Sequence, residues 1–234
     1  MVTNRHVFEN REQVVVRFNP EEASTAAREY PVDLKNQNGQ RLWLAHDNPD
    51  VDVAVLAINA KQLQQDRVKF AVFQSDKHVA SLSKVEELGV SEGDGVYVLG
   101  FPMGLVGGER NFVIVRQGVI ARIRDAVAKK GAEVLIDATV FPGNSGGPVV
   151  TRPEIASVSG TRAVGAAYLV GLVRSYVPYR DVALSAQTQR PRVIFEENSG
   201  LAAVVPIDFV QEVIRRHVQT LPEVPAAPQP TPES

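Results

Sequence analysis

Short β-rich runs, punctuated by glycine, proline and asparagine about every ten residues, constrain the fold of this chain more than any other feature. Such a series is typical of an all-β barrel or sandwich. Helical periodicity is clear only near the C-terminus, where Asp208 is predicted to cap a helix whose apolar residues share one face. The predicted strands are 14–18, 41–45, 53–58, 96–99, 112–116, 118–123, 133–136, 148–151, 163–173, 192–195 and 201–205.

Composition and charge exclude several classes of protein. The 234 residues carry a formal net charge of -2, so a dedicated nucleic-acid binder, which needs a basic surface, is not expected. No apolar run is long enough for a transmembrane helix, so no membrane span is expected. Cysteine is absent, which excludes disulfides and a cysteine nucleophile. The cellular location is left open.

The segment 141–149, FPGNSGGPV, is the strongest candidate for chemistry. A serine hydroxyl is a poor nucleophile at neutral pH, so it needs a base for its proton and donors for the oxyanion that its attack creates. Here Gly143 and Ser145 could donate backbone N–H groups, while Gly146 and Gly147 leave room for a substrate backbone. The competing interpretation is a glycine-rich turn with an incidental serine.

Two further segments supply partners for Ser145. His6 lies in VTNRHV, and Asp52 directly precedes the apolar run VAVL. Asp47 and Asp50 compete with Asp52 for the acidic role. We favour Asp52 because a carboxylate at a strand entrance can be buried and aimed at an imidazole, where it holds one tautomer and stabilises the imidazolium. Taken singly, each residue is more typical of a structural or surface position.

The order and spacing of these residues decide between chemistry and coincidence. The order His, Asp, Ser is that of the chymotrypsin type, whereas subtilisins and α/β-hydrolases use other orders. His6 and Asp52 are 46 residues apart, and Asp52 and Ser145 are 93 apart. The chymotrypsin type has separations of roughly 45 and roughly 93. Motif, order and spacing together therefore favour a Ser-His-Asp triad.

With these motifs the chain resembles the trypsin-like serine peptidase family, which has the chymotrypsin fold, and within it the HtrA/Deg-like bacterial branch. VTNRHV resembles the histidine motif, DVAVL the aspartate motif and IDATVFPGNSGGP the serine segment. The resemblance covers about residues 1–220, and it extends to the stretches YVLGFP, VRQGVI and GLAAVVPID.

The resemblance implies an all-β fold of two antiparallel six-stranded β-barrels with a C-terminal helix and the triad in the cleft between the barrels. The polar stretch 75–91 indicates a boundary between two halves, so we expect the first barrel in residues 1–80 and the second barrel with the helix in 81–221. The Pro-rich segment 222–234 is predicted to be a disordered tail. Met1 lies only five residues before His6, so we expect the first barrel to be incomplete at its N-terminus.

The function implied by the resemblance is that of a serine endopeptidase acting through an acyl-enzyme on protein or peptide substrates. Ser145 would be the nucleophile, His6 the base and Asp52 the orienting acid. The oxyanion hole would comprise Gly143, Asn144 and Ser145. No metal or organic cofactor is implied, and a homo-oligomer is an open possibility. The alternative, favoured by the missing opening strands, is a catalytically inactive protease-like module that binds peptides.

The resemblance also outlines a substrate pocket. No aspartate occupies the Thr139 position, so a preference for Lys or Arg is not implied, and we expect a small to medium apolar side chain instead. The segment 176–199 is predicted to overhang this pocket, with an ordinary surface insertion as the alternative. The predicted pocket residues are Thr139, Val173, Arg174, Ser175, Ser199, Gly200 and Leu201.

Overall fold

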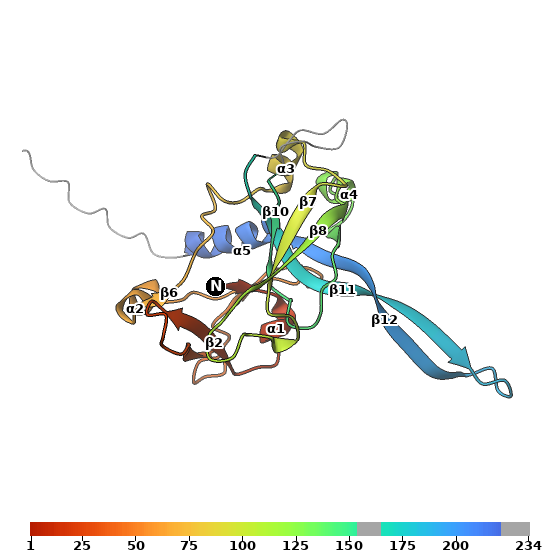
Figure 1. Ribbon diagram of the computed structural model, residues 1–234, viewed down its shortest axis with the longest axis horizontal. Helices are drawn as coiled ribbons and strands as arrows, with labels where there is room; N and C mark the ends of the chain where they lie inside the picture. Colours follow the sequence, from red (N-terminus) through yellow and green to blue (C-terminus); the bar gives the residue numbers. More distant parts are fainter. Residues whose placement is uncertain (154–164, 221–234) are drawn as a thin grey trace, which may run out of the picture.

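The computed structural model describes residues 1–153 and 165–220 and consists mainly of β-strands with short helices (Figure 1). The predicted strand 163–173 begins outside these residues, and the whole of the predicted tail 222–234 lies outside them. In the part of the chain that is described, no helix combines the length and the hydropathy needed to cross a membrane.

The C-terminal half forms a closed antiparallel barrel of six strands. Its interior is filled by buried, mainly β-branched side chains, among them Val98, Ile120, Ile136 and Val204, which pack well in a small barrel. The prediction of a six-stranded barrel is therefore confirmed. The strands run in the order β10 (Pro148–Thr151), β11 (Leu169–Leu184), β12 (Pro191–Pro206), β9 (Val134–Asp137), β8 (Ile114–Arg122) and β7 (Gly95–Gly100).

The N-terminal half contains six strands in two three-stranded sheets, which do not close on each other in the described residues. Its core packs Phe8 and Leu34 around Trp43, whose ring lies 5.6 Å from that of Phe8 in an edge-on contact. One sheet contains β1 (Val2–Thr3), β5 (Ala54–Val55) and β4 (Leu44–Ala45), and the other β3 (Arg28–Asp33), β2 (Gln13–Pro20) and β6 (Val68–Lys69).

Several elements differ from the sequence prediction. The separate strands 112–116 and 118–123 are one strand, β8, because Gly118 does not break it. A Cβ at Gly118 would lie 2.3 Å from the carbonyl oxygen of Asp137, so the glycine permits a close approach of β8 and β9. Four α-helices were missed because each is too short to show a periodic pattern. They are α1 (Arg5–Phe8), α2 (Ala60–Gln65), α3 (Leu82–Leu88) and α4 (Arg124–Val127).

The predicted C-terminal helix is confirmed as α5 (Ile207–Thr220), although it begins one residue before the predicted cap. The carboxylate of Asp208 instead accepts a hydrogen bond from the backbone N–H of Leu82, at 2.9 Å. Leu82 is the first residue of α3. Asp208 therefore satisfies a free donor at the start of a different helix.

Helix α5 also holds a loop of the N-terminal half. His46 Nε2 lies 2.9 Å from Glu212 Oε2, and Asp47 forms an ion pair with Arg216. Val51 and Val53 are buried in the same apolar cluster as residues of α5. The loop 46–53, which carries Asp52, is thus fastened to the last helix by both polar and apolar contacts.

The segment between β7 and β8 joins the two halves on the opposite side. Asn111 donates from its side-chain amide to the carbonyl oxygen of Arg17, at 2.7 Å, and its N–H donates to Asn19 Oδ1, at 2.8 Å. Arg110 donates to the carbonyl oxygen of Pro20 at 3.0 Å. These bonds dock the segment onto β2 and so fix the spacing of the two halves.

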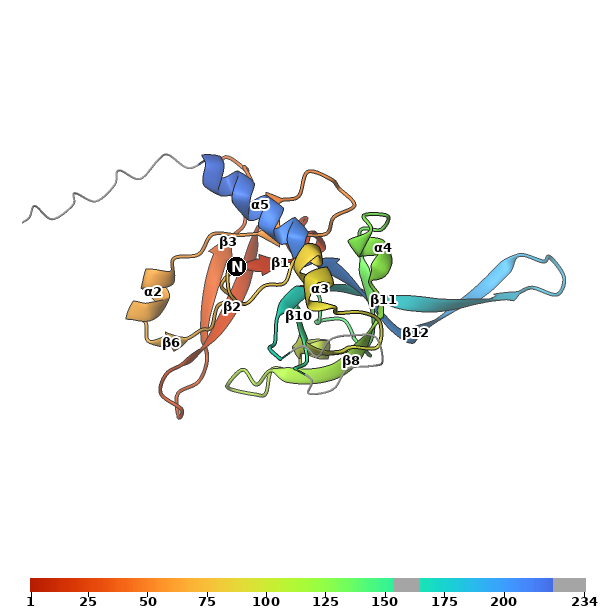
Figure 2. The same cartoon turned by 90° about the horizontal axis from the view of Figure 1, so that it is seen from above.

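Beyond the barrel, β11 and β12 continue as a two-stranded hairpin, which we name the arm (residues 177–199). Figures 1 and 2 show the arm extending away from both halves of the molecule. The prediction that this segment overhangs the pocket is therefore wrong. The backbone groups of the arm pair with each other in the ladder between β11 and β12, and the segment does not fold back over the barrel.

Candidate active site

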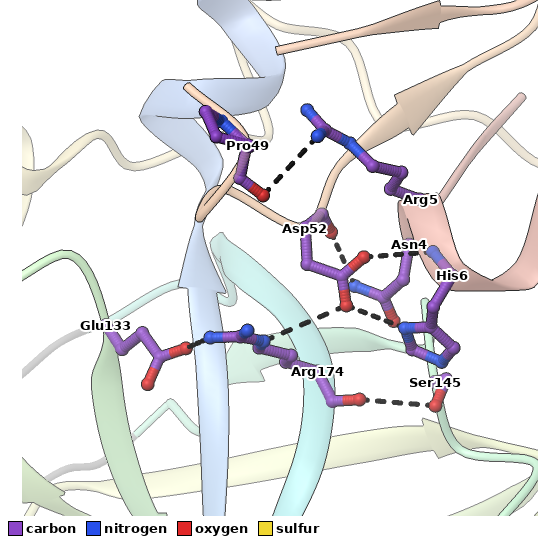
Figure 3. Close-up of polar contacts among 8 residues, drawn as sticks. All are labelled: Asn4, Arg5, His6, Pro49, Asp52, Glu133, Ser145 and Arg174. Carbon is purple, nitrogen blue, oxygen red and sulfur yellow. Dashed lines mark hydrogen bonds and ion pairs between the residues drawn. The ribbon is translucent and has the colours of Figure 1, made fainter. Parts of the chain in front are cut away.

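Three separate elements bring His6, Asp52 and Ser145 to one place. His6 lies in the short helix α1 (Arg5–Phe8) after β1, Asp52 in the loop before β5, and Ser145 in the turn before β10. All three line one cleft of about 410 Å³ between the halves. Figure 3 shows Ser145 beneath the edge of the His6 ring that faces away from Asp52.

Asp52 contacts His6 through both carboxylate oxygens. Oδ2 lies 2.6 Å from His6 Nδ1, and Oδ1 accepts the backbone N–H of His6 at 3.1 Å. The Asp52 side chain is 12% exposed, whereas that of His6 is 49% exposed. Of the two competing acids, Asp47 is engaged elsewhere, since its carboxylate pairs with Arg216.

These contacts shift the pKa of both groups. Burial by itself would raise the pKa of Asp52, but the hydrogen bonds from His6 and the charges of His6 and Arg174 together outweigh burial, so the pKa is lowered. The hydrogen bond to Asp52 raises the pKa of His6 and outweighs the opposing effect of burial. A charged Asp52 therefore favours the tautomer with hydrogen on Nδ1, which leaves Nε2 as an acceptor.

The hydroxyl of Ser145 donates to the carbonyl oxygen of Arg174, at 3.2 Å. No hydrogen bond joins it to His6 within the described residues. Rotation about the Cα–Cβ bond of Ser145 would redirect the hydroxyl without moving the backbone. Long or misaligned catalytic hydrogen bonds are common before substrate binds.

The turn around Ser145 leaves two backbone donors free. The N–H groups of Gly143 and Ser145 have no acceptor in residues 1–153 and 165–220. The N–H of Asn144, by contrast, donates to the carbonyl oxygen of Phe141 at 3.0 Å, and Asn144 Oδ1 accepts the N–H of Phe141 at 3.0 Å. Asn144 was predicted to be part of the oxyanion hole. Its N–H already has an acceptor, so Asn144 stabilises the turn and the two free donors are those of Gly143 and Ser145.

Glycine is required at two positions of this turn. Gly143 has φ +97° and Gly146 has φ +77°, in the left-handed region that favours glycine. A Cβ on Gly143 would lie 2.5 Å from the carbonyl oxygen of Phe101. A Cβ on Gly146 would lie 2.3 Å from Thr3 Oγ1. Since Thr3 belongs to β1, the serine turn fits directly against the N-terminal half.

Two residues beside His6 were missed by the sequence analysis. Asn4 is fully buried and donates from its side chain to the carbonyl oxygen of Asp52, at 2.8 Å. The guanidinium of Arg5 donates to three carbonyl oxygens of the loop that leads to Asp52, and Figure 3 shows the one of Pro49. Their closeness in sequence to His6 was the only available signal. These carbonyl groups belong to His46, Asn48 and Pro49.

Glu133 was also missed, because its partner is distant in sequence. Its carboxylate forms an ion pair with Arg174, 41 residues away. Arg174 Nε in turn lies 3.8 Å from Asp52 Oδ2. Asp52 is therefore placed between an imidazole and a guanidinium, and Glu133 holds the guanidinium from its other side (Figure 3).

The predicted substrate pocket is brought together only in part. Val173, Arg174 and Ser175 line the cleft of Ser145. Thr139, Ser199, Gly200 and Leu201 are not among the residues that line this cleft. The additional lining residues, which the sequence analysis missed, are Val140, Phe141, Pro142 and Tyr176.

The family model of the trypsin-like peptidase domain matches residues 1–154, which include His6, Asp52 and Ser145. The chain belongs to this family. The trypsin-like peptidase domains are hydrolases of the peptidase class, which fits protein or peptide substrates. The sequence-based resemblance to trypsin-like peptidases is thereby confirmed.

A solved structure similar to this trypsin-like peptidase is that of Rv3671c from M. tuberculosis H37Rv, a serine-to-alanine mutant in an inactive form. The match has a TM-score of 0.41 and 16% sequence identity, and it covers 95% of this chain and 78% of the other. No curated protein matches the chain. Within the described residues, no group of three or more His, Asp or Glu side chains could hold a metal ion.

Replacing Gly143 of this trypsin-like peptidase by Ala is expected to lower kcat by about 100- to 1,000-fold, the cost of losing one oxyanion donor. The new Cβ would displace the turn from the carbonyl oxygen of Phe101 and so move the free N–H groups. Gly39→Ala is the matched control, because Gly39 has φ +75° but open space around a Cβ. Wild-type kcat in Gly143→Ala, measured on a peptide substrate, would contradict this role.

Replacing Arg174 by Gln is expected to move the acidic limb of the pH profile of kcat/KM to higher pH. The positive charge of Arg174 lowers the pKa of His6, although less than the hydrogen bond to Asp52 raises it. Its removal therefore raises this pKa, and the neutral base is available only at higher pH. Arg174→Lys keeps the charge and should leave the limb unchanged. A limb that moves equally in both variants would contradict an electrostatic effect.

Proposed function

We propose that this chain is a serine endopeptidase that hydrolyses peptide bonds through an acyl-enzyme. Ser145 is the nucleophile, and His6 is the general base and then the general acid. Asp52 orients the imidazole and balances the positive charge of the imidazolium. The observation that carries the proposal is the pairing of His6 Nδ1 with Asp52 Oδ2 at 2.6 Å, in the cleft that also contains Ser145.

The steps follow from the positions of these groups. Ser145 Oγ bonds to the carbonyl carbon of the substrate while His6 Nε2 takes the hydroxyl proton. The oxyanion accepts hydrogen bonds from the free N–H groups of Gly143 and Ser145. The C–N bond then breaks as His6 returns the proton to the departing amine. Water, deprotonated by His6, attacks the acyl-enzyme and releases the acid with Ser145 restored.

The cleft also bears on specificity. Its walls include Val140, Val173 and Tyr176 beside the nucleophile. Apolar walls favour an apolar side chain through the burial of its surface. We therefore propose a small to medium apolar residue on the amino side of the cleaved bond. Peptides that differ only at this residue, with Ala, Val, Leu or Arg, measure the preference as a ratio of kcat/KM.

A second candidate function is that of a peptide-binding module without catalysis. The observation that favours it is the Ser145 hydroxyl, which donates to Arg174 and not to His6. An activated serine attacks the phosphorus of a fluorophosphonate, displaces fluoride and forms a stable phosphonate ester, whereas an unactivated serine reacts far more slowly. This reactivity distinguishes the two candidates directly.

The test is labelling with a fluorophosphonate probe of the wild-type chain and of Ser145→Ala. We expect the wild-type chain to be labelled on Ser145 and the variant to remain unlabelled. Mass spectrometry of the labelled peptide identifies the residue. Absence of label on the folded wild-type chain, with peptide binding retained, would reject the endopeptidase and leave the binding module.

A further inference from the structure

The arm exposes apolar side chains along its whole length. On β12 Ile194 is 63% exposed and Phe195 55%, and their cross-strand neighbours on β11 are Val182 and Asp181. Successive residues of a strand point to opposite faces, so both faces of the arm carry exposed apolar residues. Further exposed apolar residues of the arm are Tyr179, Leu184 and Val193. Such a surface is typical of a contact with another protein.

The arm also has free strand edges. Beyond the barrel, β12 pairs with β11 from Pro191 to Asn198, and its pairing with β9 is confined to Leu201–Val204. Its outer edge over 191–198 therefore faces no other strand of the described chain. An isolated two-stranded hairpin is marginally stable in water, and a free edge invites pairing with a further strand.

The sequence of β12 is complementary to itself when two copies pair antiparallel about a two-fold axis at Ile194. In this register Val193 lies opposite Phe195, and Arg192 lies opposite Glu196. Opposite charges and apolar pairs at facing positions both stabilise an antiparallel sheet. Each contact occurs twice, as an isologous interface requires.

The edge of β11 does not offer the same match. A two-fold axis at Asp181 would oppose two carboxylates, and Pro178 lacks the N–H that a ladder needs. The whole arm carries three basic and three acidic residues, so no net charge opposes self-association. Charge and register therefore favour the pairing of β12 of one copy with β12 of a second copy.

We infer that the arms of two copies of this chain pair through β12 and form a four-stranded antiparallel sheet between two peptidase domains. Each arm supplies two further strands to the hairpin of the other copy, and the free edge of each β12 is then paired. This inference does not depend on the proposed catalytic activity, because it concerns residues outside the cleft.

Cross-linking tests the register, since the natural chain contains no cysteine. Ile194→Cys would place two cysteines opposite each other at the axis, within the reach of a disulfide. We expect this variant to form a covalent dimer under mild oxidation. The matched control is Val182→Cys on the neighbouring strand, whose copies would be three strand spacings, roughly 14 Å, apart and so out of reach. Cross-linking of Val182→Cys but not of Ile194→Cys would overturn the inference.

Sedimentation velocity over a range of protein concentrations tests the association itself. We expect a dimer for the wild-type chain and its loss in Ile194→Lys, which brings two ammonium groups together at the axis. Val115→Lys, at a site on β8 of the barrel that is also more than half exposed, should leave the dimer intact. A wild-type chain that remains monomeric at every concentration, or a dimer that survives Ile194→Lys, would overturn the inference.

Discussion

Replacing Ser145 by Ala is expected to reduce kcat by a factor on the order of 10⁶, as for other peptidases that lose the nucleophile of a triad. The variant keeps the backbone turn, because Ala tolerates the conformation of Ser and the required glycines are untouched. It also keeps the cleft walls, so KM should change little. The measurement is the cleavage rate of an apolar peptide substrate at saturating concentration.

The control for this prediction is Ser24→Ala. Ser24 is exposed on the N-terminal half, where its hydroxyl donates to Glu22 Oε1 at 3.1 Å. Its replacement should leave kcat unchanged. If Ser145→Ala retained a large part of the activity while a second serine carried the fluorophosphonate label, Ser145 would not be the nucleophile.

Replacing Asp52 by Asn is expected to lower kcat by about 10⁴-fold. An amide at this position can donate to the imidazole, and it then favours the tautomer that presents an N–H to Ser145 instead of a lone pair. The amide also cannot balance the charge of the imidazolium formed in the transition state. Side-chain volume is nearly unchanged, so the loss in rate should occur without a large loss of stability.

The same variant has a defined pH signature. The hydrogen bond and charge of Asp52 raise the pKa of His6, so their removal lowers this pKa. Since His6 must be neutral to accept a proton, the acidic limb of kcat/KM should move to lower pH in Asp52→Asn. Asp50→Asn, two residues earlier, is the control and should show neither effect. Equal losses in both variants would indicate that the loop, and not the carboxylate, matters.

The three site residues were accessible from sequence because each lies in a short motif with a local backbone requirement. The turn that presents Ser145 needs Gly143 and Gly146 at positive φ, and those glycines are visible in the sequence. Order and spacing then linked Ser145 to His6 and Asp52. Local motifs could thus identify the residues that the fold brings to one cleft.

The polar surroundings of Asp52 were not accessible in the same way. Glu133 and Arg174 meet because β9 and β11 both pair with β12 in the barrel, and nothing in either local sequence indicates the other. The paired state of the Asn144 N–H is likewise a property of the folded turn. Such contacts depend on the register of distant strands, which local periodicity does not encode.

The arm illustrates a different failure of sequence reasoning. Its charged residues interrupt the apolar pattern, so only 192–195 was predicted as a strand beyond the barrel, and the segment 176–199 was expected to overhang the pocket or to be an ordinary surface insertion. In the structure Arg180 and Glu196 pair across β11 and β12, with 2.8 Å between Nε and Oε2. Both faces of this hairpin are exposed to solvent, so charged residues can occur on either face of a regular strand. They therefore break the apolar–polar alternation that is expected of a strand with one buried face.

The attachment of the loop 46–53 to α5 has a consequence for the position of Asp52. The loop aims Asp52, yet its anchors Glu212 and Arg216 lie in the last helix that the structure describes. These contacts join residues that are 166 and 169 positions apart in the sequence. The orientation of the acid that faces His6 is therefore coupled to the folding of α5, so that a change that loosens this helix also loosens the candidate active site.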